Sequence, residues 1–236
     1  MVEKDNINSI IIAGCSFSDW SQVEYNYGEY LGQNLNLPIK FYSSGCGSNF
    51  RIWRKLTKAI LDKEITSKDL LIIQYTNPDR KEFWSSHSSP QTFDYKPSGN
   101  PIKGSPMRDK YLDGDIIKFK MGASTWQLVK EEKTFFQLLE ENFTSEKFDI
   151  EIFINNHVMF QSLLKEYKIP TIFLKTNYIN MVRDIPVIDC SFHHYLDVKH
   201  IQIANLCNEE GCSHLNDDGH KELANILTDY INTNIK

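Results

Sequence analysis

Residues 9–18 read Ser-Ile-Ile-Ile-Ala-Gly-Cys-Ser-Phe-Ser, and this stretch decides the fold. It opens with a nearly continuous run of β-branched and apolar side chains that ends at Gly14. Strands that are buried on both faces have this composition, and such strands belong to parallel sheets. The same pattern recurs, more weakly in the last two segments, in residues 69–76, 170–176, 39–43 and 186–188.

Helical periodicity fills the gaps between these predicted strands. Apolar side chains recur at spacings of three and four in four segments, residues 29–37, 50–61, 148–167 and 217–231. Asn216 is a suitable N-cap for the last of them. Strands that alternate with helices form βαβ units, so we expect a parallel sheet with helices on both faces and a ligand site at the carboxyl ends of the strands.

The length of the chain favours one domain. At 236 residues it lies within the range of a single α/β unit, so we expect residues 1–236 to form one domain. Residues 85–129 are rich in Ser, Pro, Gly, Asp and Lys and show no sustained period. Because this segment has no core pattern of its own, we expect an irregular insertion that serves function or is disordered.

Composition excludes several classes of protein. With 41% hydrophobic and 24% charged residues the chain is neither wholly disordered nor fibrous. Its net charge of -5 argues against nucleic acid as a partner. No apolar stretch approaches about 18 residues, so we expect no signal peptide, no membrane partner and a cytoplasmic protein. The 5 scattered cysteines are expected to be free thiols.

Polar residues follow the predicted strands. Ser16 stands just after Gly14 at the start of the next helix, where it can act as a nucleophile or simply cap that helix. After the second strand, the glycines of residues 43–49 (Ser-Ser-Gly-Cys-Gly-Ser-Asn) either bring backbone N–H groups close to a ligand or form an ordinary turn. Asn77 after the third strand can donate a hydrogen bond into the same site, although Asn-Pro also starts turns. His214 precedes the last helix, from where it can serve as a general base.

The order of these segments, from Gly14 to Ala224, resembles the SGNH (GDSL-type) hydrolase family. The strongest match is residues 214–224, His-Leu-Asn-Asp-Asp-Gly-His-Lys-Glu-Leu-Ala. Residues 14–18, Gly-Cys-Ser-Phe-Ser, and residues 75–84 are similar to the first and third blocks of a microbial and viral subgroup, so a virus-encoded protein fits the resemblance.

The resemblance implies an α/β fold that is a three-layer α/β/α sandwich of the flavodoxin-like kind, with about five parallel strands. It implies Ser16 as the nucleophile and His214 as the general base. It also implies an oxyanion hole formed by the Ser16 N–H, the Asn77 side chain and a glycine N–H, for which we favour Gly47 over Gly45. A neighbouring polar residue, Asn49, is a further candidate to line the site or bind the oxyanion.

One departure concerns the third member of the catalytic set. The family has an Asp three residues before its catalytic histidine, where this chain has Gly211. Glu210 and Asp189 are the candidates to orient His214 in its place, and a backbone carbonyl is the alternative. Since losing that acid costs about 10⁴ in rate in a triad, a catalytically weak binding module stays open.

The expected reaction is hydrolysis of a small acyl ester, such as an acetyl group on a carbohydrate, without a cofactor or metal. Acyl transfer by the same Ser16 and His214 is the first alternative. A competing zinc site is less favoured because its ligands have an unusual spacing; its candidate ligands are Cys207, Cys212, His214 and His220. Cys15 is a better intrinsic nucleophile than Ser16, but we expect it to point into the core.

Overall fold

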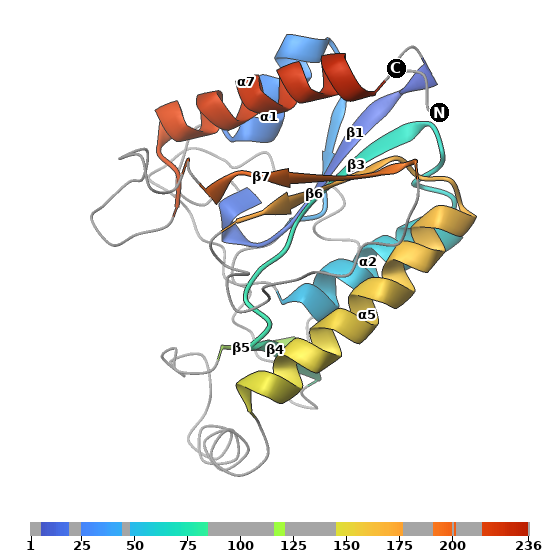
Figure 1. Cartoon of the computed structure of the whole chain (residues 1–236), viewed down its shortest axis with the longest axis vertical. Helices are drawn as coiled ribbons and strands as arrows, with labels where there is room; N and C mark the ends of the chain where they lie inside the picture. The colour runs from blue at the N-terminus through green and yellow to red at the C-terminus, as the bar shows by residue number, and fades with distance from the viewer. Residues whose placement is uncertain are drawn as a thin grey trace.

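The computed structural model describes residues 6–18, 25–43, 48–84, 116–120, 145–176, 191–199, 201 and 214–235. For Ser16 and for residues 81–84 and 116–120, this description covers the backbone. Figure 1 shows a central sheet with long helices on both sides of it.

The sheet has five strands in the order β2-β1-β3-β6-β7. All four neighbouring pairs are parallel. The strand bounds are β1 Ser9–Ala13, β2 Ile39–Phe41, β3 Asp69–Gln74, β6 Thr171–Lys175 and β7 His193–Asp197. This order is the flavodoxin-like one, and the predicted parallel sheet is confirmed.

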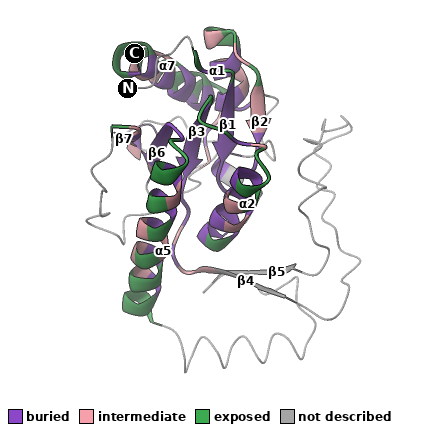
Figure 2. Ribbon diagram, turned by 90° about the vertical axis from the view of Figure 1, so that its right-hand side faces the viewer, coloured by how far each residue is buried: buried purple, intermediate pink, exposed green. Residues whose placement is uncertain are grey.

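Alternate residues of β1 serve two separate cores. The helix bounds are α1 Tyr27–Leu35, α2 Asn49–Leu61, α5 Glu146–Glu166 and α7 Asp217–Asn234. Ile10 and Ile12 pack into a cluster with α1 and α7, whereas Ile11 and Ala13 pack with α2 and α5. Because all four strand residues are fully buried, and each large apolar side chain so buried contributes about 1.5–3 kcal/mol, both helical layers stabilise the sheet (Figure 2).

Helix caps set where two of the predicted helices begin. Asn26 and Glu29 form a capping box, so α1 begins two residues before the predicted segment 29–37. Asn216 caps α7 as predicted, and its Oδ1 accepts a hydrogen bond from the Gly219 N–H at 2.9 Å.

The strand beside β6 is one that the sequence did not predict. Residues 186–188, the predicted edge strand, lie outside the described residues, and the strand beside β6 is β7. Its sequence, His-His-Tyr-Leu-Asp, looks polar because an edge strand has only one neighbour and most of its residues stay partly exposed. The first residue of β7, His193, is nevertheless buried.

An antiparallel ribbon lies apart from the main sheet. It pairs β4 (Arg80–Trp84) with β5 (Ile116–Lys120). The second strand of the ribbon falls inside residues 85–129, for which the sequence had suggested no regular structure. A five-residue strand in a polar segment gives too short a pattern to detect.

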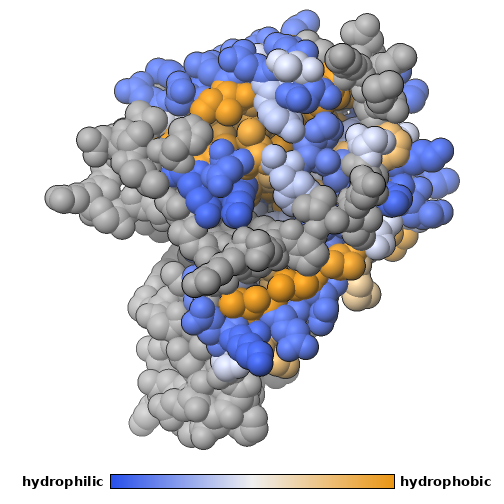
Figure 3. Space-filling view, viewed as in Figure 1, coloured by the Kyte–Doolittle hydropathy of each residue, from blue (hydrophilic) through white to orange (hydrophobic). Residues whose placement is uncertain are grey.

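Three apolar side chains of α5 are exposed, namely Phe148, Ile152 and Met159. Figure 3 shows a band of hydrophobic residues on the face of the molecule that it draws. None of the helices within the described ranges is long and apolar enough to cross a membrane. A groove of about 440 Å³ on this side is lined by Phe50, Trp53, Arg54, Thr57, Lys58, Leu61, Asp62 and Asn156. None of these is a predicted site residue.

Candidate active site

The sheet changes its direction of growth between β1 and β3. The chain passes from β1 to β2 on one side, and then returns to add β3 on the other side of β1. Ligands of open α/β sheets bind beyond the carboxyl ends of the strands at such a switch point. Since Ala13 pairs with Ile73, β1 and β3 end almost level, and the segments that follow them start side by side.

Gly14 allows a tight turn at the end of β1. A Cβ atom at this position would lie only 2.6 Å from Ser18 Oγ and 2.8 Å from Gln74 Oε1. The chain continues into a single 3-10 turn, η2 (Ser16–Ser18), whose last N–H donates to the Cys15 carbonyl at 3.0 Å. Ser16, the predicted nucleophile, is the first residue of η2. A larger residue at position 14 would therefore push the turn that carries Ser16 away from β3.

Gln74, the last residue of β3, holds this turn in place. Its Oε1 accepts a hydrogen bond from the Cys15 N–H at 3.2 Å, and also from the Cys15 thiol at 3.3 Å and the Ser18 hydroxyl at 3.4 Å. Gln74 and Cys15 are both fully buried, so the expectation that Cys15 points into the core is confirmed. Sequence reasoning did not single out Gln74. A polar residue at the end of the apolar run Leu-Leu-Ile-Ile was the signal that marks it.

The segment after β2 is described at residues 42–43 and again from Ser48 onward. Both candidate oxyanion glycines, Gly45 and Gly47, lie outside the described residues. Ser48 caps α2 by accepting a hydrogen bond from the Arg51 N–H at 3.2 Å. Asn49, the first residue of α2, is buried, and both ends of its side-chain amide bond to the backbone of Thr76.

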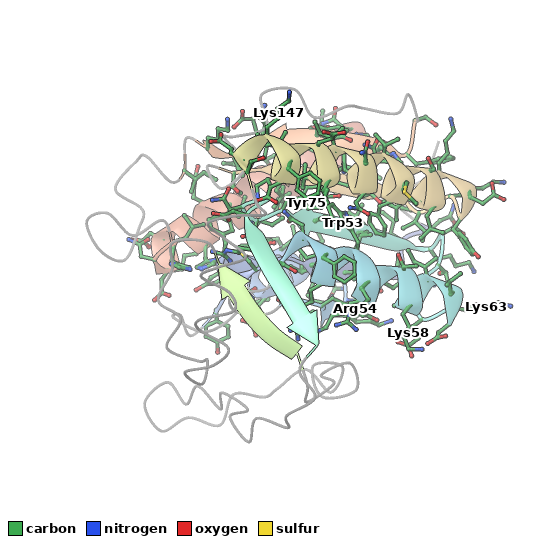
Figure 4. All side chains as sticks on the ribbon, turned by 90° about the horizontal axis from the view of Figure 1, so that it is seen from below. Trp53, Arg54, Lys58, Lys63, Tyr75 and Lys147 are labelled. Atoms are coloured by element: carbon green, nitrogen blue, oxygen red, sulfur yellow. The ribbon has the colours of Figure 1, made fainter. Side chains whose placement is uncertain are left out.

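The segment after β3 is anchored by α2 and α5, which cover one face of the sheet. Tyr75 is fully buried, and Figure 4 shows it beside Trp53. Its hydroxyl accepts a hydrogen bond from Trp53 Nε1 at 3.2 Å and lies 2.8 Å from His157 Nδ1. Burial raises the pKa of Tyr75 well above its usual value, so this group is a neutral anchor for the residues that follow it.

Asn77 starts a turn, as the Asn-Pro sequence had suggested. The Arg80 N–H donates to the Asn77 carbonyl at 3.1 Å across this turn. The Asn77 side chain is half-buried, and its Oδ1 is buried without a hydrogen-bond partner among the residues that the structure describes. A native structure rarely leaves such an atom unpaired without a reason. Asn77 therefore forms the turn and keeps its side-chain oxygen, an acceptor, unpaired in the described contacts beside the end of β3.

His214 lies half-buried just before α7. Burial lowers the pKa of its imidazole, and the positive charge of Arg80 lowers this pKa further. The second effect indicates that the charged end of the Arg80 side chain lies on the His214 side of the Asn77 turn. Glu210 and Asp189, the two candidates to orient His214, fall outside the described residues.

His220 has a structural role in the described contacts. Its Nδ1 accepts a hydrogen bond from the Tyr27 N–H at 3.1 Å, and its ring stacks on Tyr27 with 6.1 Å between centroids. Burial, followed by the nearby His214, lowers the pKa of His220 to about 4. Within the described ranges no group of three or more His, Cys, Asp and Glu side chains could hold a metal ion. Cys207 and Cys212, the thiols of the competing zinc set, lie outside those ranges.

No family model and no curated protein sequence matches this chain. Solved structures do match. One described as a lipolytic protein of the G-D-S-L family from Desulfitobacterium hafniense DCB-2 aligns with a TM-score of 0.51 at 10% identity, covering 94% of this chain and 98% of that one.

Two further structures align over similar lengths. One, described as an acylhydrolase from Bacteroides fragilis NCTC 9343, has a TM-score of 0.50 at 10% identity and covers 100% of this chain and 92% of that one. The lipase Lip_vut3 from a goat rumen metagenome has a TM-score of 0.51 at 8% identity, covering 94% and 96%. At such low identities the likeness concerns the fold alone. The chain therefore has the three-layer α/β/α fold of the SGNH (GDSL-type) hydrolases.

Proposed function

We propose that this protein is a serine-dependent hydrolase of a small acyl ester. Ser16 attacks the ester carbonyl through its hydroxyl oxygen, and His214 takes the hydroxyl proton. The proton then passes to the leaving alcohol, and an acyl-enzyme remains. A water molecule, activated by His214, attacks this acyl-enzyme and releases the acid. The leaving alcohol expected from the family resemblance is a carbohydrate.

The observation that carries this proposal is the arrangement at the switch point. The η2 turn and the Asn77 turn follow adjacent parallel strands that end almost level. The charge of Arg80, which lies in the Asn77 turn, influences the His214 imidazole. A nucleophile, an oxyanion donor and a base have to converge within a few ångströms to perform acyl transfer, and these elements supply candidates for all three. In the proposal, the Asn77 amide and the N–H groups of Ser16 and Gly47 bind the oxyanion.

Covalent labelling tests the proposal directly. A fluorophosphonate probe reacts with an activated serine, and we expect a single adduct that peptide mass spectrometry locates on Ser16. The heat-unfolded protein should stay unlabelled, because activation requires the folded site. An unlabelled Ser16 in folded protein that is shown to be intact by circular dichroism would reject the hydrolase and favour a binding module.

The pH dependence offers a second test. The general base has to be neutral, and burial and Arg80 lower the pKa of His214 below its usual 6.5. We therefore expect kcat/KM to fall on acidification with a midpoint below pH 6.5, so that activity persists into mildly acidic solution. Arg80→Gln removes one cause of the lowered pKa and should move this midpoint upward. Profiles of kcat/KM between about pH 4 and 9 measure both, and a midpoint that moves downward in Arg80→Gln contradicts the assignment.

A further inference from the structure

We propose that Asn49 is a positioning residue that fixes the oxyanion-binding side chain of Asn77 through the backbone of Thr76. This inference rests on the function proposed above and adds to it a residue that supports the reaction without touching the substrate. Its basis is a pair of hydrogen bonds that join the start of α2 to the segment after β3.

The two hydrogen bonds hold Thr76 from both sides. Asn49 Oδ1 accepts from the Thr76 N–H at 2.8 Å, and Asn49 Nδ2 donates to the Thr76 carbonyl at 2.8 Å. The N–H belongs to the peptide before Thr76, and the carbonyl belongs to the peptide that leads into Asn77. One planar amide thus fixes the orientation of two successive peptide planes, and the second of these directs the Cα atom of Asn77.

Thr76 lies beyond the end of β3, where the hydrogen bonds of the sheet no longer fix the backbone conformation. It is the second residue after β3, which ends at Gln74. Both Thr76 and Asn49 are buried, at 0% and 5% exposure, so water does not readily replace the lost partners when the Asn49 amide is removed. The segment on the far side of Asn77 is held separately, by the Arg80 N–H at the Asn77 carbonyl.

Asn49 also joins the start of α2 to the segment that carries Asn77. It follows Ser48, the N-cap of α2, and so comes two residues after Gly47 in the chain. Asn77 follows Thr76 directly. One side chain therefore links the first residue of α2 to the residue before Asn77. Because a displacement of about 1 Å in a catalytic group can lower a rate 10²-fold, this link is expected to affect kcat.

The test is a double-mutant cycle on ester hydrolysis with p-nitrophenyl acetate. We expect Asn49→Ala to lower kcat by about 10-fold or more while KM changes less than about 2-fold, since the oxyanion forms only in the transition state. Asn77→Ala should lower kcat by about 10²-fold or more. In the Asn77→Ala background, the second substitution should cost less than about 3-fold, because the group that Asn49 positions is already absent.

The matched control is Ser9→Ala. Ser9 is also buried, and its hydroxyl bonds to Asp69 at the opposite end of β1 and β3. This variant loses a buried hydrogen bond and should lower the melting temperature without changing kcat. If Asn49→Ala does not fold, Asn49→Asp replaces it, since aspartate keeps the acceptor for the Thr76 N–H and loses the donor to the Thr76 carbonyl.

The outcomes separate the two proposals. The positioning role is overturned if kcat is unchanged in a folded Asn49 variant. It is also overturned if the kcat losses of the two single variants multiply in the double variant. Both outcomes leave the proposed hydrolase function intact. Labelling that fails at Ser16 in the wild-type protein, or an esterase activity that survives Ser16→Ala, overturns the proposed function itself. The positioning role is also overturned if Asn49→Ala and Ser9→Ala both lose kcat in the same proportion to their loss in melting temperature.

Discussion

Replacing Ser16 with alanine is expected to lower kcat for ester hydrolysis by about 10⁴-fold or more. The hydroxyl is the atom that forms the acyl-enzyme in the proposed reaction, and loss of a serine nucleophile removes the covalent route entirely. A factor of 10⁴ corresponds to about 5 kcal/mol in the barrier. The backbone N–H of residue 16 remains, so the variant should still bind substrate with a similar affinity.

Steady-state kinetics with p-nitrophenyl acetate measures this loss, and binding of an unreactive substrate analogue measures the retained affinity. Ser162→Ala is the matched control, because Ser162 is an exposed serine on α5 whose hydroxyl bonds only to its own helix at Val158 in the described contacts. We expect wild-type rates from it. An activity that persists in Ser16→Ala at more than about a tenth of the wild-type rate places the nucleophile elsewhere and rejects the assignment.

The sheet and its two helical layers could be predicted because their signals are local. The apolar runs of β1, β3 and β6 have no polar face, since both faces of a central strand are buried. The helix α2 shows the 3.6-residue period because only one of its faces packs on the sheet, with Ile52, Leu56 and Ile60 in the core. The strand β7 escaped prediction because it is an edge strand, in which neither pattern is complete.

The contacts that organise the candidate site were not predictable, because they join residues far apart in the sequence. Gln74 and Cys15 are separated by 59 positions, and Asn49 and Thr76 by 27. A local sequence pattern cannot distinguish an Asn side chain that bonds to the backbone of a distant segment from one that caps its own helix. Asn49 illustrates this, since its sequence position favours a site-lining role and the structure shows its amide bonded to Thr76.

The predicted order of the site segments can be compared with the observed sheet. The predicted order of segments is compatible with the switch point because both Gly14 and Asn77 follow strands that lie next to each other. The nucleophile, the base and the oxyanion donors remain predictions, because a family resemblance in sequence order carries no side-chain geometry.

Replacing His214 with alanine is the second large effect we expect, with a fall in kcat of about 10³-fold, within the range of general acid–base catalysis. The half-buried position of the ring means that its removal leaves a space that opens to solvent. Added imidazole should enter this space and restore part of the rate. The rescued rate should rise with the neutral fraction of the added imidazole, since the neutral form accepts the proton.

The control for this variant is His194→Ala. His194 is a half-buried histidine of β7 whose Nδ1 lies 3.2 Å from the Tyr230 hydroxyl, outside the proposed catalytic set. It should keep the wild-type rate and gain nothing from imidazole. Rescue that is confined to His214→Ala identifies a proton acceptor, because a residue that merely supports the fold would show a lost rate that imidazole leaves unchanged. A rate that stays at the wild-type level in His214→Ala contradicts the base assignment, and would direct the search for the proton acceptor to the other groups at the carboxyl ends of the strands.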